Sequence, residues 1–336
     1  MAKKDTVLIT GATGFVGRRL VAQIVKHWDK DNVVCLAYDK DTFFETEGQS
    51  LLKKFGVNIV KGDLLKPRSL SSLPQKPSLT IHLAAETNTA KNNHDVNSVG
   101  TKNLLKAIGP LGKESHFIHI STMVIAAGRL NCEKPISEST PDYPSNEYTR
   151  TKLSGEKTLL HKCQEDNFRL TIIRPNTIYG KNVRKNSLFD MVKEMIENNS
   201  LVTRINWPGK SALIHVDDFV EFILRTTKSN PKPGTPNNFL VYTENLSISD
   251  ISKTMHKALG ITYKPIALPK AFWSIGSWGR RFIFPLENIL PANLYNQLWR
   301  TTIITDHAVN CKTSKAQKEF GEWRNKYFEE YVKDVL

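Results

Sequence analysis

Tyr148 and Lys152 lie four residues apart in the segment EYTRTK, and this pair of side chains could carry out acid–base chemistry. Residues at this spacing on a helix project from one face. A free Tyr hydroxyl has a pKa near ~10, which is too high for efficient proton transfer at neutral pH. An ammonium about 4 Å away, at an effective dielectric of ~20, would favour the phenolate by up to ~4 kcal/mol, or roughly three pKa units. Taken alone, such a pair is more often the exposed surface of an amphipathic helix, so its meaning depends on its context.

A glycine-rich segment, GATGFVG at residues 11–17, could bind a pyrophosphate. Glycines permit a tight turn and a close approach of backbone N–H groups to the anion, and a following helix adds positive potential at its N-terminus. A packing turn is the alternative interpretation. The position of the loop directly after the first β-rich run favours the binding interpretation.

The elements that must position these residues alternate between β-rich runs and helical patterns, which indicates βαβ units and a parallel sheet. We expect strands at Thr6–Thr10, Val33–Tyr38, Asn58–Val60, Leu79–Leu83, Phe117–Ser121 and Leu170–Arg174. We expect helices at Gly14–His27, Val96–Ile108 and Tyr148–Gln164. The fold class is therefore α/β, a Rossmann-type doubly wound sheet with a smaller, discontinuous C-terminal lobe.

The alternation weakens after Gly180, and a Pro- and Asn-rich break follows at residues 228–238. We assign residues 1–180 to a dinucleotide-binding domain, to which residues 211–228 return. Residues 181–210 and 229–336 would form a substrate-binding lobe. A chain of 336 residues suits one large domain with a smaller lobe.

Composition and charge argue against a disordered chain and against a nucleic-acid-binding protein. Hydrophobic residues make up 40% and charged residues 24%, which is ordinary for a globular protein. The net charge of +14 comes from scattered basic residues, so we favour a solvated basic surface and expect no nucleic-acid partner. The N-terminus lacks the apolar region of a secretory signal, which predicts a cytoplasmic location. Four separated cysteines predict reduced thiols and no metal site.

Further segments follow in an order that resembles the extended short-chain dehydrogenases/reductases, the NAD-dependent epimerase/dehydratase family. Besides GATGFVG and the Tyr–Lys pair, they are GDL at residues 62–64, HLAA at 82–85, Asn97, RPNTIYG at 174–180 and HVDD at 215–218. An ordered series is more specific than any single motif. The resemblance covers residues 5–225 and implies an enzyme that binds NAD(P).

The resemblance also implies site roles. Tyr148 would be the acid/base, Lys152 would lower its pKa and bind the nicotinamide ribose, and Thr122 would orient a substrate oxygen. A hydroxyl at the end of a strand is commonly only a local cap, which is the alternative for Thr122. The expected cofactor contacts are Gly11, Thr13, Gly14, Phe15, Val16, Gly17, Tyr38, Asp39, Asp63, Leu64, Leu83, Ala84, Ala85, Ser121, Tyr148, Lys152 and Pro175.

Cofactor choice depends on the end of the second strand, where NAD-preferring sites carry a carboxylate for the ribose 2′-hydroxyl. That position is Ala37, so NADP is slightly favoured, and Arg18 or Lys40 could approach a 2′-phosphate. Asp39 would favour NAD instead if the strand ran further.

Departures from the family patterns narrow the range of substrates and reactions that we expect. Met123 and Val124 stand where dehydratases have Asp-Glu, and Thr177 and Ser211 stand where epimerases usually have the Asn and Arg that serve a nucleotide diphosphate. The pattern is closer to the 3β-hydroxysteroid dehydrogenase and dihydroflavonol reductase branch. We therefore expect hydride transfer to or from a secondary alcohol or ketone of a mostly apolar small molecule. A nucleotide-sugar epimerase and a non-catalytic dinucleotide-binding regulator are the alternatives.

Residues 270–290 are rich in aromatic side chains but contain Arg280, Arg281 and Pro285, so they are no membrane span. They could form the core of the lobe, a wall of the substrate pocket or a peripheral membrane contact. A homodimer is a further expectation.

Overall fold

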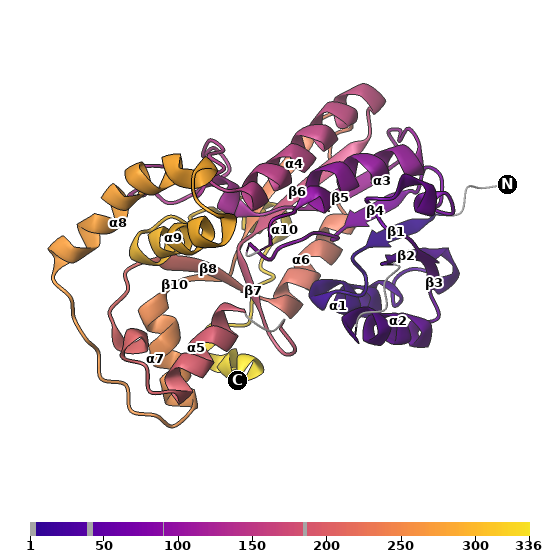
Figure 1. Ribbon diagram of the computed structural model, residues 1–336. Helices are drawn as coiled ribbons and strands as arrows, with labels where there is room; N and C mark the ends of the chain where they lie inside the picture. Colours follow the sequence, from indigo (N-terminus) through magenta and orange to yellow (C-terminus); the bar gives the residue numbers. More distant parts are fainter. Residues whose placement is uncertain (1–4, 39–42, 90, 184–186) are drawn as a thin grey trace.

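The computed structural model describes residues 5–38, 43–89, 91–183 and 187–336. Its main sheet has seven parallel strands in the order β3-β2-β1-β4-β5-β6-β9 (Figure 1). These strands are β1 (Val7–Thr10), β2 (Val33–Ala37), β3 (Asn58–Lys61), β4 (Leu79–His82), β5 (His116–Ile120), β6 (Arg169–Pro175) and β9 (Pro236–Val241). The expected Rossmann-type α/β fold is confirmed.

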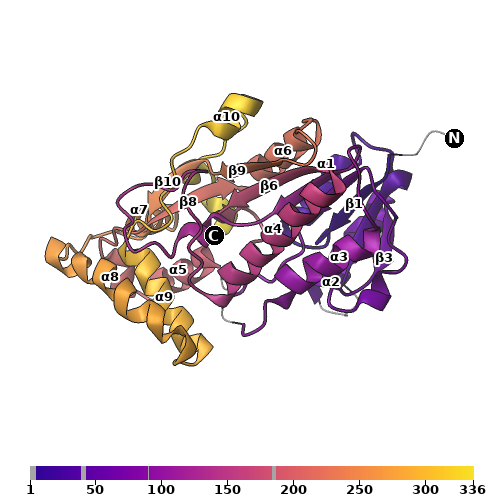
Figure 2. The ribbon, with the colours of Figure 1, turned by 90° about the horizontal axis from the view of Figure 1, so that it is seen from above.

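Helices cover both faces of this sheet, so its central strands are buried and apolar on both sides. One face packs against α1 (Phe15–Ile24), α2 (Phe43–Phe55) and α6 (Val216–Thr227). The other packs against α3 (Thr101–Ile108) and α4 (Glu147–Asp166), as Figure 2 shows from above. In β1, for example, Val7 and Ile9 point to the first face and Leu8 to the second.

A smaller sheet of order β10-β8-β7 forms the centre of the C-terminal part. Its strands are β7 (Thr177–Tyr179), β8 (Lys210–His215) and β10 (Glu244–Ser247). Around it lie α5 (Leu188–Glu197), α7 (Ile248–Ala258) and α11 (Phe328–Tyr331), which share a core with it. The helix pair α8 (Lys270–Ile283) and α9 (Ala292–Thr305) lies at the end of the molecule away from β1–β3, and α10 (Lys315–Phe320) packs beside β9 (Figure 1).

The division into domain and lobe stays a prediction, but two parts of it need correction. Residues 229–336 were expected in the lobe, whereas β9 pairs with β6 and forms an edge of the main sheet. Of the returning segment 211–228, α6 packs against α1, whereas β8 pairs with β7 and β10. Strand pairing across distant residues decides both points, and local sequence does not encode it.

The helix expected at Val96–Ile108 begins with a π-helical turn, Val96–Gly100, before α3. This turn packs closely on α4, because a Cβ on Gly155 would lie 2.4 Å from the Asn97 carbonyl oxygen. All four cysteines are buried and free. Within the described ranges, no helix is both long and apolar enough to cross a membrane.

Candidate active site

The glycine loop forms a tight turn between β1 and α1. Gly11 has a φ of +68°, a conformation that favours glycine, and a Cβ at this position would lie 2.7 Å from the Ala84 backbone nitrogen after β4. At Gly17 a Cβ would meet the Gly11 carbonyl oxygen at 2.1 Å, so this glycine permits close packing of α1 on the loop. Among the described residues outside its own turn of helix, a Cβ on Gly14 would have the same oxygen, at 3.2 Å, as its one neighbour within 4 Å. The space above Gly14, at the start of α1, is therefore open enough for a phosphate to approach the backbone.

The other expected cofactor contacts lie at neighbouring strand ends. Leu83, Ala84 and Ala85 follow β4, and the Ala84 N–H donates to Thr10 Oγ1 at 3.2 Å. Asp63 and Leu64 follow β3, where Asp63 Oδ1 accepts from the Leu65 N–H at 2.9 Å. The carboxyl ends of these parallel strands share one edge of the sheet, where dinucleotides bind in such folds.

Several of the residues that bear on the choice between NAD and NADP lie within the part of the chain that the structure describes. Ala37 is the last residue of β2 and is fully buried, and Tyr38 beside it is 36% exposed. Arg18 forms an ion pair with Glu47 of α2 at 3.1 Å. Thr13 of the glycine loop donates to Glu45 of the same helix at 2.8 Å, so α2 is attached to this loop. Asp39 and Lys40 lie outside the described residues.

Tyr148 and Lys152 lie one turn apart on α4, as predicted. Asn146 caps this helix reciprocally with Thr149, which fixes its start two residues before Tyr148. The buried Lys152 ammonium donates to the Ile120 carbonyl oxygen at the end of β5, at 2.6 Å. Burial lowers the pKa of Lys152 to about 8, and the nearby Glu156 carboxylate partly offsets this effect. The group is thus still mostly protonated at neutral pH and can support a phenolate.

Glu156 follows Lys152 by one further turn and is buried, but its charge is balanced by Arg174. The Arg174 guanidinium binds both Glu156 oxygens and also reaches Asp142 at 2.8 Å. This network joins α4, the end of β6 and the segment before α4. Pro175, an expected cofactor contact, follows Arg174 directly and ends β6.

Ser121 and Thr122 stand at the end of β5, next to the carbonyl that Lys152 binds. Thr122 caps the short helical turn Met123–Ala126, since its Oγ1 accepts from the Val124 N–H at 3.3 Å. That bond leaves the hydroxyl proton available to donate elsewhere. Ser121 Oγ is buried and has no hydrogen-bond partner among the described residues. A buried hydroxyl without a partner is costly, so Ser121 fits a position that a bound ligand would satisfy.

Two buried histidines lie beneath Lys152 on β4 and β5. His82 bonds Thr10 at 2.6 Å and Thr101 at 3.0 Å, and burial lowers its pKa to about 3. Burial also lowers the pKa of His119 well below its usual value. Both rings are therefore neutral at pH 7 and place no positive charge beside the Lys152 ammonium.

Sequence reasoning missed His94, whose ring centroid lies 5.8 Å from that of Tyr148. No motif includes this residue, so sequence alone offered no signal. Asn97, expected as a structural residue, holds the segment after β4 through two 3.0 Å bonds to the Glu86 backbone. It also donates to Thr151, the neighbour of Lys152, at 3.3 Å.

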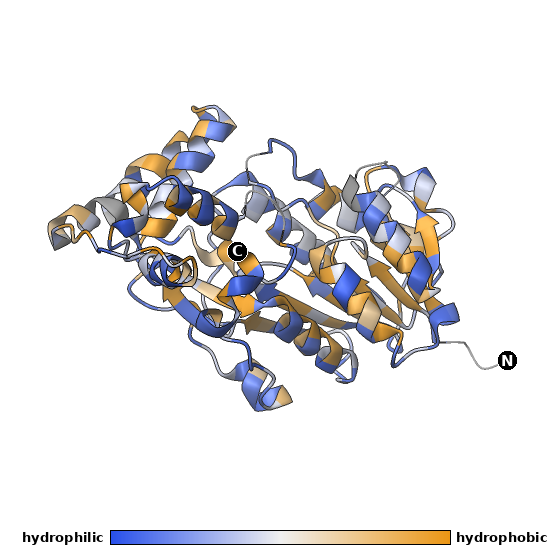
Figure 3. Cartoon of the chain, turned by 90° about the horizontal axis from the view of Figure 1, so that it is seen from below, coloured by the Kyte–Doolittle hydropathy of each residue, from blue (hydrophilic) through white to orange (hydrophobic). Residues whose placement is uncertain are grey.

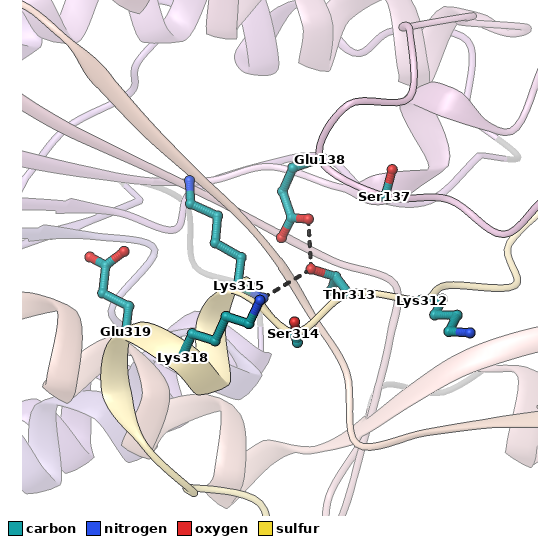
Figure 4. A pocket seen from close by; sticks show the side chains of 8 residues that line it. All are labelled: Ser137, Glu138, Lys312, Thr313, Ser314, Lys315, Lys318 and Glu319. Carbon is teal, nitrogen blue, oxygen red and sulfur yellow. Dashed lines mark hydrogen bonds between the residues drawn. The ribbon is translucent and has the colours of Figure 1, made fainter.

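An open hollow of about 490 Å³ lies elsewhere, between α10 and the segment at Ser137 (Figure 4). It is lined by Lys312, Lys315 and Lys318 among others, and by none of the predicted site residues. Lys315 is engaged by Asn237 at 2.7 Å, and Glu138 accepts from Thr313 at 2.6 Å. The chemistry-bearing residues thus lie at the strand ends, away from this hollow.

Gly14→Val is expected to abolish dinucleotide binding, because the added methyl groups occupy the space through which a phosphate reaches the backbone. Thermal stabilisation by NAD and NADP measures this effect. Gly17→Ala is the contrasting variant: it should destabilise the fold itself, since its Cβ would overlap the Gly11 carbonyl. Equal stabilisation of the wild type and Gly14→Val by the dinucleotides would contradict this site.

Comparisons with known proteins agree with this geometry. The model of the NAD dependent epimerase/dehydratase family matches residues 7–241. A UDP-glucose 4-epimerase from Vibrio cholerae is 24% identical over 289 residues, which cover 82% of each chain. An N-acetyl-alpha-D-glucosaminyl-diphospho-ditrans,octacis-undecaprenol 4-epimerase from Escherichia coli O157:H7 is 26% identical over 274 residues, 79% of this chain and 76% of that one.

A similar solved structure is that of UDP-glucuronic acid 4-epimerase from Bacillus cereus, in complex with UDP-glucuronic acid and NAD. It superposes with a TM-score of 0.72 at 20% identity, covering 98% of this chain and 97% of that one. The fold is therefore shared along nearly the whole length, and the family match covers more than half of the sequence. The chain belongs to the NAD dependent epimerase/dehydratase family, within the extended short-chain dehydrogenases/reductases, and is an NAD(P)-dependent enzyme of the oxidoreductase type.

Proposed function

We propose that this enzyme transfers hydride between a nicotinamide and a secondary alcohol or ketone of a mostly apolar small molecule. The bound nicotinamide supplies the hydride donor or acceptor. Tyr148 exchanges a proton with the substrate oxygen, and Lys152 favours the phenolate. Thr122 donates its hydroxyl proton to the same oxygen and orients it. The buried, protonated Lys152 one turn from Tyr148 supports this assignment.

The hydrogen bond between Thr177 and Ser211 is the observation that supports an apolar substrate. Their hydroxyl oxygens lie 2.8 Å apart, and Asn176 also donates to Ser211 at 3.0 Å. The two positions where family epimerases usually place anchors for a diphosphate are thus short side chains occupied with each other. Without charged donors there, apolar burial at ~25 cal/mol per Å² is the better source of substrate affinity.

A nucleotide-sugar epimerase is the second candidate, and the epimerases among the relatives favour it. It would use the same Tyr148, Lys152 and Thr122, and Lys210 of β8 would be its remaining cation near Ser211. A non-catalytic dinucleotide-binding regulator is the third. It is disfavoured because binding alone has no physical need for the Tyr–Lys–Thr combination.

A substrate panel tests the proposal. Apolar secondary alcohols and ketones should be turned over with a change in nicotinamide absorbance, and UDP- or GDP-sugars should bind weakly. Calorimetric binding of a nucleotide sugar at about micromolar Kd, lost in Lys210→Gln, would favour the epimerase instead.

We further propose that NADP binds at least as tightly as NAD, because Ala37 offers no carboxylate to the ribose 2′-hydroxyl. Arg18 is the cation that would meet a 2′-phosphate, and Glu47 now shares its charge. Arg18→Gln should therefore weaken NADP binding and spare NAD, while Glu47→Gln should strengthen NADP binding. Calorimetry that gives a tenfold preference for NAD, about 1.4 kcal/mol, would contradict the proposal.

From the sequence we also propose a homodimer in the cytoplasm with a peripheral membrane contact through residues 270–290. Sedimentation velocity tests the oligomeric state.

A further inference from the structure

An exposed apolar stripe runs along the outer side of α8 and the helical turn Phe284–Asn288. Trp278 and Phe282 are each 67% exposed, and Ile289 is 73% exposed. The spacing of four residues places Trp278 and Phe282 on one side of α8, and Ile289 directly follows the 3-10 turn Phe284–Asn288. Figure 3 shows apolar, orange segments on the helices at this end of the molecule. Large exposed apolar side chains on successive turns of one helix are typical of a surface that contacts another molecule or a membrane.

The inner side of α8 is fixed, so the helix cannot turn to bury this stripe. Arg280 is fully buried and donates to the carbonyl oxygens of Ala127, Arg129 and Thr302 at 2.7, 3.1 and 3.0 Å. Its Nε lies 3.1 Å from Asp306. These bonds hold Trp278 and Phe282 outward.

The chain segment that carries the stripe is basic. From Lys264 to Leu286 the chain contains no Asp or Glu, and the Lys264 and Arg281 side chains are exposed. The first acidic residue, Glu287, is ion-paired with Arg150 of α4. Aromatic and aliphatic side chains flanked by basic ones are typical of surfaces that lie on anionic lipid.

We propose that Trp278, Phe282 and Ile289 insert into the headgroup region of an anionic membrane, and that the membrane delivers the apolar substrate. The delivery step rests on the proposed function. A second copy of the chain is the weaker candidate, because two identical faces with this charge would repel each other.

The lobe connects this surface to the catalytic helix. On α9, which packs against α8, the Trp299 indole donates to Ser145 Oγ at 2.8 Å and Tyr295 donates to the Ser145 carbonyl oxygen. Ser145 precedes Asn146, the cap of the helix that carries Tyr148. These bonds connect α8, through α9, to the start of α4.

Flotation with vesicles tests the contact. The wild type should bind vesicles of phosphatidylcholine with phosphatidylglycerol, bind phosphatidylcholine alone more weakly, and lose binding as salt rises above about 0.1 M. Trp278→Ser with Phe282→Ser should lower the partition coefficient by about tenfold or more. Leu201→Ser, at a site 61% exposed and outside the stripe, is the matched control and should bind like the wild type.

Failure of the wild type to bind these vesicles, or wild-type binding by the double variant, would overturn the membrane contact. So would conversion of a dimer to a monomer by the double variant with vesicle binding unchanged. These measurements contain no substrate, so they are independent of the proposed reaction.

For delivery, the double variant should lose kcat/KM for an apolar ketone held in vesicles and keep it for a water-soluble ketone. An equal rate on the vesicle-borne ketone would overturn delivery.

Discussion

Replacing Tyr148 by Phe is expected to lower kcat by roughly 10²–10⁴-fold and to leave dinucleotide affinity nearly unchanged. The ring and its packing against His94 stay, and only the hydroxyl that exchanges a proton is lost. Stopped-flow turnover and calorimetric titration with the dinucleotide measure the two quantities separately. Near-normal turnover by the Phe variant would place the acid/base elsewhere.

Lys152→Ala separates the role of the ammonium from that of the phenol. This variant should lose both turnover and dinucleotide affinity, because the proposed ribose contact disappears with the positive charge. Lys157→Ala, on the exposed side of the same helix, is the matched control and should change neither. If Lys152→Ala lost turnover but kept its dinucleotide affinity, Lys152 would not contact the ribose.

Much of the fold could be predicted because apolar runs and turn residues are local signals. β2 begins at Val33 as expected and ends one residue early, at Ala37, and α4 begins one residue earlier than predicted, at Glu147, where Asn146 caps it, and ends two residues later, at Asp166. β9 was missed because Pro236 and two Asn precede its apolar residues. Its membership of the main sheet comes from pairing with β6, a long-range contact.

The residues of the candidate site that belong to sequence motifs were predicted, whereas several residues outside these motifs were not. The glycines and the Tyr–Lys pair have fixed spacings, whereas the Thr177–Ser211 bond joins two strands and is visible only in three dimensions. His94 approaches Tyr148 through the segment after β4, which no periodicity constrains. Arg280 is the clearest case: an Arg in an aromatic helix suggests an exposed cation, yet this side chain is fully buried.

Asp306→Asn is expected to lower the free energy of unfolding by about 3–5 kcal/mol, because it leaves the Arg280 guanidinium buried without an anion. Arg280 is fully buried and the Asp306 side chain is 15% exposed, so solvent screens this ion pair little. Burial already lowers the pKa of Arg280, and Asp306 opposes that effect. Urea denaturation monitored by tryptophan fluorescence measures the change.

The Lys257–Glu329 pair supplies the control, since its side chains are 77% and 73% exposed at a similar separation of 3.0 Å. Glu329→Gln should leave the free energy of unfolding unchanged within error, because water already solvates both charges. Arg280→Met combined with Asp306→Asn should cost less than the sum of the two single changes, since no buried charge is then left alone. An Asp306→Asn variant as stable as the wild type would show that the three carbonyl oxygens suffice to hold the guanidinium. The outward orientation of Trp278 and Phe282 would then depend on those hydrogen bonds and not on the ion pair.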